Sequence, residues 1–145
     1  AMREAFKVIE PHLEVESAEI VGKVVIGSLK GNIQGLGKDI VAATLRAAGL
    51  QVVDVGVDVP PEVFVDTAVR EKAQVIGVSI SIEETIPLLR DLVELLQQRK
   101  LSGTVKTVIG GQATSEKTRR EYRIDAYAKD AWDCVKKVKQ LLANA

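Results

Sequence analysis

Three short groups of small and polar residues, far apart in the sequence, could together hold a ligand. Residues 31–37 contain three glycines with Asn32 and Gln34 between them, residues 79–81 carry two serine hydroxyls, and residues 110–111 are both glycine. Glycine tolerates positive φ and lets a bulky ligand approach the backbone closely. Amides and hydroxyls offer hydrogen bonds, so the chemistry indicated is ligand binding.

Side chains for acid–base or nucleophilic catalysis are scarce. His12 is the only histidine and Cys134 the only cysteine, so the sequence holds no Ser-His-Asp or Cys-His set. We interpret His12 as a surface or capping residue, and Trp132 and Cys134 as residues that pack the last helix. The charged run at residues 117–123 is interpreted as a solvated helix face.

The glycine-containing loop lacks the residues that common nucleotide sites require. A Walker loop needs serine or threonine after its lysine, and Lys38 is followed by Asp39. The glycine spacing does not match a dinucleotide-binding fingerprint. Five aromatic residues are too few for a flavin sandwich, and Ser79 stands where a receiver domain would carry a phosphorylated aspartate.

Length and composition indicate one domain with an aliphatic core. The chain has 145 residues, of which 46% are apolar and 3% aromatic. Twenty basic and twenty acidic residues cancel, which argues against nucleic acid or an anionic membrane as the main partner. No apolar run approaches the length of a membrane span, and a single cysteine fits a reducing compartment, so we expect the cytoplasm.

Hydrophobic periodicity predicts alternating strands and helices. Strands are expected at residues 23–28, 51–55, 74–79, 105–109 and, weakly, 124–128. Helices are expected at about residues 3–13, 37–48, 61–72, 85–100, 115–123 and 130–143. This order indicates a flavodoxin-like (Rossmann-like) α/β fold, with a five-stranded parallel sheet in the order 2-1-3-4-5 and helices on both faces. The three ligand-binding groups would meet at the carboxyl ends of strands 1, 3 and 4.

A resemblance then becomes specific. Residues 27–41, Gly-Ser-Leu-Lys-Gly-Asn-Ile-Gln-Gly-Leu-Gly-Lys-Asp-Ile-Val, resemble the cobalamin-binding loop of corrinoid methyl carriers and methionine synthase. That family's motif is Asp-x-His-x-x-Gly, followed by Ser-x-Leu and then Gly-Gly. Here 41 residues separate Gly37 from Ser79, and 28 separate Ser81 from Gly110, which suits the family. The resemblance covers about residues 3–143 and includes the segments 55–61 and 125–131.

The resemblance implies cobalamin bound with its nucleotide base off the cobalt and threaded into the domain. The loop at residues 32–37 would lie under the corrin, Ser79 would hydrogen-bond the base, and the glycine pair would leave space beside the tail. The cofactor residues it implies are Asn32, Ile33, Gln34, Gly35, Leu36, Gly37, Ser79, Ile80, Ser81, Gly110, Gly111, Gln112, Tyr127 and Ala128. It implies no catalytic side chain and no protein ligand to the metal. Without it, the same groups read as a polar loop, a strand end, an ordinary turn and packing residues.

The sequence departs from the family motif at three positions. Asn32 replaces the aspartate, Gln34 replaces the histidine that binds cobalt, and Ser81 replaces the leucine. A carboxamide oxygen is a weaker donor than imidazole, so we expect at best a weak or water-bridged contact from Gln34 to cobalt. A weak lower ligand favours reduction to four-coordinate Co(I).

By this resemblance the chain is a methyl carrier that serves partner methyltransferases and is restored by a reductive activase. Residues 1–18 would be the last helix of an N-terminal helical cap and its linker, and residues 19–145 the cobalamin-binding domain. Two alternatives stay open: a cobalamin sensor or storage module, and a domain that has lost cobalamin and serves only in protein contacts.

Overall fold

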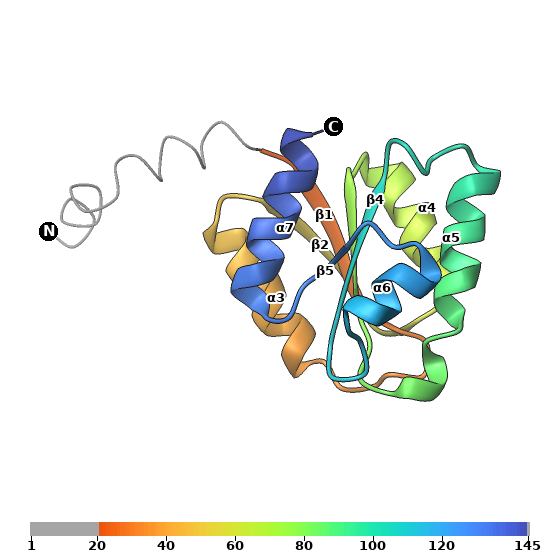
Figure 1. Ribbon diagram of the computed structural model, residues 1–145. Coiled ribbons are helices and arrows are strands. Elements are labelled where there is room, and N and C mark those ends of the chain that lie inside the picture. The colour runs from red at the N-terminus through yellow and green to blue at the C-terminus, as the bar shows by residue number, and fades with distance from the viewer. Residues whose placement is uncertain (1–20, 145) are drawn as a thin grey trace, which may run out of the picture.

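The computed structural model describes residues 21–144 as one parallel sheet with helices on both faces (Figure 1). The expected helix at residues 3–13 and the linker after it lie outside the described residues. The strands are β1 (Lys23–Leu29), β2 (Gln51–Val59), β3 (Val75–Ser79), β4 (Lys106–Gly110) and β5 (Ala126–Tyr127). They pair in the order β2-β1-β3-β4-β5, which confirms the predicted flavodoxin-like topology.

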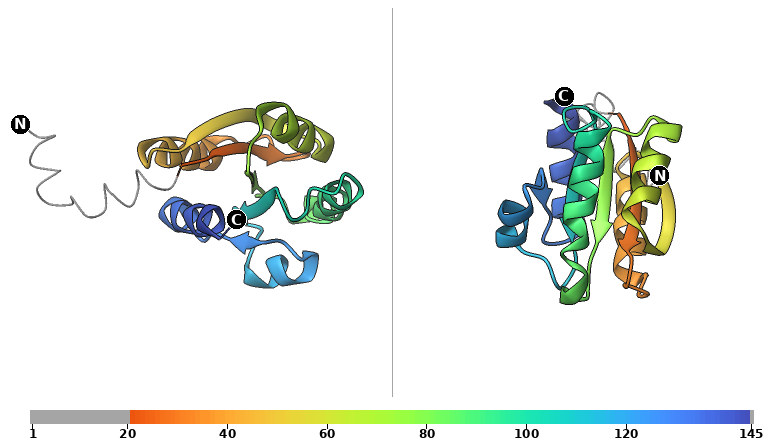
Figure 2. Two further views of the ribbon diagram at one scale, coloured as in Figure 1. Left: turned by 90° about the horizontal axis from the view of Figure 1, so that it is seen from above. Right: turned by 90° about the vertical axis from the view of Figure 1, so that its right-hand side faces the viewer.

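The helices form the two outer layers of the fold. They are α3 (Leu36–Ala47), α4 (Pro61–Glu71), α5 (Leu88–Gln98), α6 (Glu116–Tyr122) and α7 (Ala131–Ala143), with a 3₁₀ turn, η1 (Glu83–Thr85), before α5. Helices α3 and α7 lie side by side on one face of the sheet, and α4 and α5 cover the other (Figure 2). Helix α6 packs beside α5 and β5. Among the described residues, no helix is long and apolar enough to cross a lipid bilayer.

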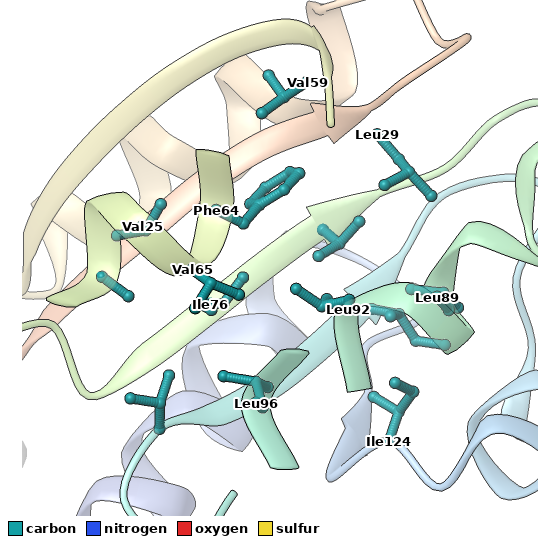
Figure 3. Close-up of a cluster of buried hydrophobic side chains, with 14 of the residues drawn as sticks. Val25, Leu29, Val59, Phe64, Val65, Ile76, Leu89, Leu92, Leu96 and Ile124 are labelled. Carbon is teal, nitrogen blue, oxygen red and sulfur yellow. The ribbon is translucent and has the colours of Figure 1, made fainter. Parts of the chain in front are cut away.

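The two faces of the sheet carry separate hydrophobic cores. The core under α4 and α5 contains Phe64 and large aliphatic side chains such as Leu89 and Leu92 (Figure 3). The core under α3 and α7 is built from fewer and smaller side chains, among them Ala42 and Cys134. Alternating residues of the central strands supply both cores because successive strand side chains point to opposite faces.

The structure corrects several predicted boundaries. Strand β2 runs on to Val59, beyond the predicted end at residue 55, because a bulge lets it continue beside β1: Ile26 pairs with Asp54, and Gly27 with Gly56. Gly56 has a φ of 95°, and its N–H donates to Asp54 Oδ1 at 2.8 Å. Pro87 precedes the first residue of α5, which starts later than predicted, at Leu88.

One predicted packing residue is not packed. Trp132 has 77% of its surface exposed, although Cys134 on the same helix is buried as expected. The two positions lie 200° apart on the helix, so they cannot face the same core. The charged residues of α6 are mostly exposed, as predicted for a solvated face.

Candidate functional site

A cavity of about 430 Å³ opens at the carboxyl edge of the sheet and extends between the sheet, α3 and α7. Residues of α3 and α7, the two helices that Figure 1 shows on the same side of the sheet, line it. Its walls are formed by Ile26, Gly37, Lys38, Ile40, Val41, Gly77, Val78, Ser79, Val108, Ile109, Gly110, Gly111, Gln112, Thr114, Tyr127, Ala128, Lys129, Asp130, Ala131 and Cys134. Parallel strands with helices on both faces are expected to bind ligands at this edge.

The cavity has a polar mouth and an apolar interior. Ser79, Gln112 and Lys129 line the cavity at or just beyond the ends of the strands. Two residues before the last residue of β3 and of β4, the lining residues are Gly77 and Val108. The Ser79 hydroxyl has no hydrogen-bond partner within residues 21–144. It is therefore a polar group at the mouth that is available to a ligand.

The predicted site residues divide into two groups. Seven of them line the cavity: Gly37, Ser79, Gly110, Gly111, Gln112, Tyr127 and Ala128. The other seven do not line it: Asn32, Ile33, Gln34, Gly35, Leu36, Ile80 and Ser81. The second group belongs mainly to the loop between β1 and α3 and to the residues that follow β3.

The loop between β1 and α3 and the first turns of α3 present apolar side chains to solvent beside the cavity. Ile33 is 75% exposed and Leu36 74%, and Ile40, which also lines the cavity, is 51% exposed. Gln34 is exposed too, and within the described chain its side chain makes no hydrogen bond. Exposed apolar side chains grouped beside a cavity are a typical binding surface.

Asn32 is buried, in contrast to its neighbours, and ties this loop to the segment after β3. It is only 1% exposed. Its Nδ2 donates to the Leu29 carbonyl and to Thr85 Oγ1, both at 2.9 Å. Its Oδ1 accepts the N–H groups of Ser81 and Ile82 at 2.8 and 2.9 Å, and the Ser81 hydroxyl at 3.2 Å. This arrangement needs an amide, because one end donates and the other accepts.

The bulged end of β2 holds the loop from the other side. Asp58 Oδ1 accepts the Gly31 N–H at 2.8 Å, and the Asp58 N–H donates to the Asn32 carbonyl at 2.9 Å. Asp58 adopts a φ of 54°, a left-handed conformation that aspartate tolerates better than most residues. The start of the loop is thus fixed by Asp58 of β2.

Lys38, in the first turn of α3, is a buried cation on the cavity wall. It is 5% exposed, and its Nζ lies 2.8 Å from Asp39 Oδ1 and 2.8 Å from Asp54 Oδ2. Burial lowers the pKa of Lys38, but the hydrogen bonds to Asp39 and Asp54 raise it more, so the pKa lies above its ordinary value of 10.5. Lys38 is therefore a cation that anchors α3 to the β2 bulge.

The glycine pair at the end of β4 has a reason in the protein's own packing. A Cβ on Gly111 would lie 2.2 Å from the Ile80 carbonyl oxygen, and Gly111 has a φ of 112°. A Cβ on Gly110 would lie 3.2 Å from the Ala128 carbonyl. Both residues line the cavity, but Gly111 is required by the backbone of Ile80, and that requirement is independent of any ligand.

Sequence reasoning missed much of the α3 and α7 wall. Val41, Ala131 and Cys134 line the cavity, although none of them is among the cofactor residues that the resemblance implies. Burial raises the pKa of the Cys134 thiol to about 12, with a further contribution from the neighbouring Asp133 carboxylate. Cys134 is thus an unreactive thiol, and its part in the wall is that of a small apolar side chain.

Comparison with known proteins identifies the family. The profile of the B12 binding domain matches residues 22–133, which include every residue that lines the cavity except Cys134. The chain belongs to the B12-binding domain family. The trimethylamine corrinoid protein 1 of Methanosarcina mazei is 37% identical over 144 residues, covering 98% of this chain and 67% of that protein.

Solved structures agree with this assignment. The monomethylamine corrinoid protein of Methanosarcina barkeri is 30% identical with a TM-score of 0.79, covering 97% of this B12-binding chain and 66% of that one. The methanol:cobalamin methyltransferase complex MtaBC from the same organism matches with 27% identity and a TM-score of 0.80, covering 86% of this chain and 47% of that one. The chain spans about two thirds of the length of the corrinoid proteins it matches.

The residues of this B12-binding domain fit the family's ligand. Cobalamin combines a wide corrin ring with a nucleotide tail, and the cavity lies next to the exposed apolar side chains of Ile33 and Leu36. The free Ser79 hydroxyl and the apolar interior suit a tail that ends in a flat base. In residues 21–144, no cluster of three or more His, Cys, Asp and Glu side chains could hold a metal ion.

Proposed function

We propose that this chain is the cobalamin-carrying domain of a methyl-transfer system. The observation that carries the proposal is the cavity at the ends of β3 and β4, open beside Ile33 of the loop and Leu36 at the start of α3, which are both exposed to solvent. A carrier must hold its cofactor firmly by one face and leave the other accessible to an enzyme. A deep cavity for the tail beside an exposed apolar surface for the ring meets both needs.

The tail of the cofactor would enter the cavity and the ring would rest on the loop. Ser79 would hydrogen-bond the nucleotide base, Gln112 and Tyr127 would flank the tail, and Ala128 would pack against it. Asn32 would act from behind the loop by fixing its position, because it is too buried to reach a ligand. When bound, the cobalt would supply the methyl-accepting and methyl-donating chemistry, and the protein would supply orientation and access.

Gln34 would stand below the metal in place of a histidine. Its exposed side chain is free of hydrogen bonds in the described structure, so no neighbouring group orients it as a ligand. We propose that it makes a weak or water-bridged contact and that the bound cobalt is easier to reduce than above an imidazole. The Gln34→His variant provides the comparison, and its exposed position predicts an unchanged fold.

The measurement is a spectroscopic redox titration of the cobalamin-loaded wild type and Gln34→His proteins. We expect a higher reduction potential for the wild type. A potential equal to or below that of Gln34→His would contradict the proposal for Gln34, and it would leave cofactor binding itself unaffected.

The partners we propose are a methyltransferase that loads the carrier, one that unloads it, and a reductive activase for oxidised cobalt. The support is the likeness to corrinoid proteins named for trimethylamine and monomethylamine, and to a methanol:cobalamin methyltransferase complex.

The first experiment mixes the purified protein with hydroxocobalamin and separates free cofactor by gel filtration. We expect a red protein with one equivalent of cobalamin. A protein that stays colourless would refute the proposal and support a domain without cofactor. A red protein whose reduced form takes up no methyl group from any methylamine or methanol methyltransferase would favour a sensor or storage module.

A further inference from the structure

Gly77 lies in the middle of the central strand, where a glycine is unfavourable. It belongs to β3 and pairs with Ile26 of β1 and Val108 of β4. Glycine weakens a strand interior because it has more conformational freedom to lose and no side chain to pack. A glycine at such a position often marks a place where a ligand approaches the sheet closely.

The packing of the protein gives no reason for the missing side chain. A Cβ on Gly77 would meet Ile26 Cγ1 at 3.5 Å and the Val25 carbonyl at 3.8 Å, which are ordinary contacts. Gly27, in the neighbouring strand, differs: its Cβ would lie 2.6 Å from Val55. Gly77 also lacks the positive φ that makes glycine necessary at Gly111. The protein alone would therefore accept alanine at position 77.

The space that Gly77 leaves open belongs to the cavity. Its neighbours on the floor are Ile26 and Val108, and Val41 of α3 and Cys134 of α7 line the same cavity. All four are apolar, in contrast to Ser79 at the mouth. The interior therefore suits a flat, apolar group better than a phosphate or a sugar, which would leave polar atoms unpaired there.

We propose that Gly77 is a specificity-determining residue, which keeps the inner cavity open for the base at the end of the corrinoid's nucleotide tail. This inference rests on the proposed function, because it takes the ligand to be a corrinoid. It adds that the affinity for the tail is limited by the side chain at position 77. A methyl group there would occupy the space of the base while leaving the sheet intact.

The test compares two ligands across four proteins. The ligands are cobalamin, which carries a benzimidazole base, and cobinamide, which lacks the nucleotide. The proteins are the wild type, Gly77→Ala, Gly77→Val and the control Gly103→Ala, whose added Cβ would have no atom within 4 Å. Binding is measured by quenching of Trp132, the only tryptophan, which follows the cavity-lining Ala131 in sequence. Thermal unfolding of each ligand-free protein reports the fold.

We expect the wild type and Gly103→Ala to bind cobalamin at least tenfold more tightly than cobinamide. Gly77→Ala should bind cobalamin at least tenfold more weakly than the wild type, a loss of about 1.4 kcal/mol, and Gly77→Val still more weakly. Both should bind cobinamide within twofold of the wild type. The melting temperature of Gly77→Ala should equal or exceed that of the wild type.

Three results would overturn the inference. If Gly77→Ala binds cobalamin as the wild type does, the base does not reach position 77. If the wild type binds cobalamin and cobinamide equally, the tail lies outside the cavity, and the proposed placement of the tail fails with the inference, although cobalamin binding itself stands. If Gly77→Ala is unfolded, the protein's own packing excludes a side chain at position 77, and the 3.5 Å between an added Cβ and Ile26 Cγ1 is too short. Failure of the wild type to bind either corrinoid is a different result, since it refutes the proposed function as well.

Discussion

Replacing Asn32 with alanine should destabilise the protein more than its place in a loop suggests. The substitution removes five hydrogen bonds that join the loop after β1 to the segment after β3. Three of them involve backbone groups: the N–H groups of Ser81 and Ile82, and the Leu29 carbonyl. The hydroxyls of Ser81 and Thr85 can turn to other partners, and Thr85 already donates to the Ile82 carbonyl at 2.7 Å.

The size of the effect follows from the three backbone bonds. A hydrogen bond of this kind contributes about 1 kcal/mol net, and a buried backbone group without a partner costs at least as much. We therefore expect Asn32→Ala to lower the free energy of unfolding by about 3 kcal/mol. Asn32→Asp should retain the bonds from Ser81 and Ile82 but place an oxygen against the Leu29 carbonyl, for a loss of about 2 kcal/mol at neutral pH.

Urea unfolding followed by circular dichroism measures these differences. Gln34→Ala is the matched control, because Gln34 lies in the same loop, is exposed and makes no hydrogen bond in the described chain. It should change the free energy by no more than about 0.5 kcal/mol. The deficit of Asn32→Asp should shrink in acid, where a protonated carboxyl can donate to Leu29. Equal stabilities of Asn32→Ala and Gln34→Ala would refute the assigned role of Asn32.

Three further predictions concern the cavity wall. Lys38→Met should lower the free energy of unfolding by about 1–2 kcal/mol, as measured by urea midpoints, because it leaves the partly buried Asp54 carboxylate without its cation. Because the pKa of Lys38 is raised in the folded state, the stability that its charge contributes is complete below pH 10.5 and is lost as the pH rises further. Asp54→Asn should therefore lose less stability than the wild type above pH 10.5. Cys134, with a pKa of about 12, should resist a thiol reagent in the folded protein at pH 8 and react on unfolding. Above the ordinary thiol pKa of 9, the Cys134 thiol ionises more readily in the unfolded protein than in the folded one, which lowers the free energy of unfolding. Cys134→Ala should therefore lose less stability than the wild type between pH 9 and 11. Gly111→Ala should lower the urea midpoint severely or prevent folding, because its Cβ would overlap the Ile80 carbonyl; a stable Gly111→Ala protein would contradict this geometry.

The sheet was predictable because its strands are short apolar runs that need no long-range information to recognise. Apolar alternation failed at the end of β2, where the bulge at Asp54 and Gly56 shifts the pairing with β1 and lets the strand continue. The bulge holds a hydrogen bond from the Gly56 N–H to Asp54, and Asp54 also binds Lys38, which lies 16 residues earlier in the sequence. A sequence pattern contains no direct signal for such a contact.

The location of the site at the strand ends could be predicted from the sequence, whereas the contacts of its individual side chains could be predicted less well. Strand ends identify Ser79 and the residues of the glycine pair, which do line the cavity, and their roles as ligand contacts stay predictions. The resemblance predicts Asn32 as a ligand contact, because it places residues 32–37 under the corrin. Its side chain instead turns inward to Thr85 and Ser81, whose positions depend on how β3 pairs with β1. Trp132 was wrongly expected to pack, because helical spacing gives the face of a residue only relative to a known core.

The two hydrophobic cores differ in how fully they are packed, and this difference would make the lifetime of the protein depend on bound cobalamin. The face under α4 and α5 is filled by Phe64 and leucines, whereas the face under α3 and α7 encloses the cavity. An empty protein should therefore open first at α3 and α7, the side with fewer buried contacts. A ligand present at 100 times its dissociation constant adds about 2.7 kcal/mol to the folded state. Without bound corrinoid, the protein would expose these two helices to proteases more often, and its abundance would then follow the supply of corrinoid.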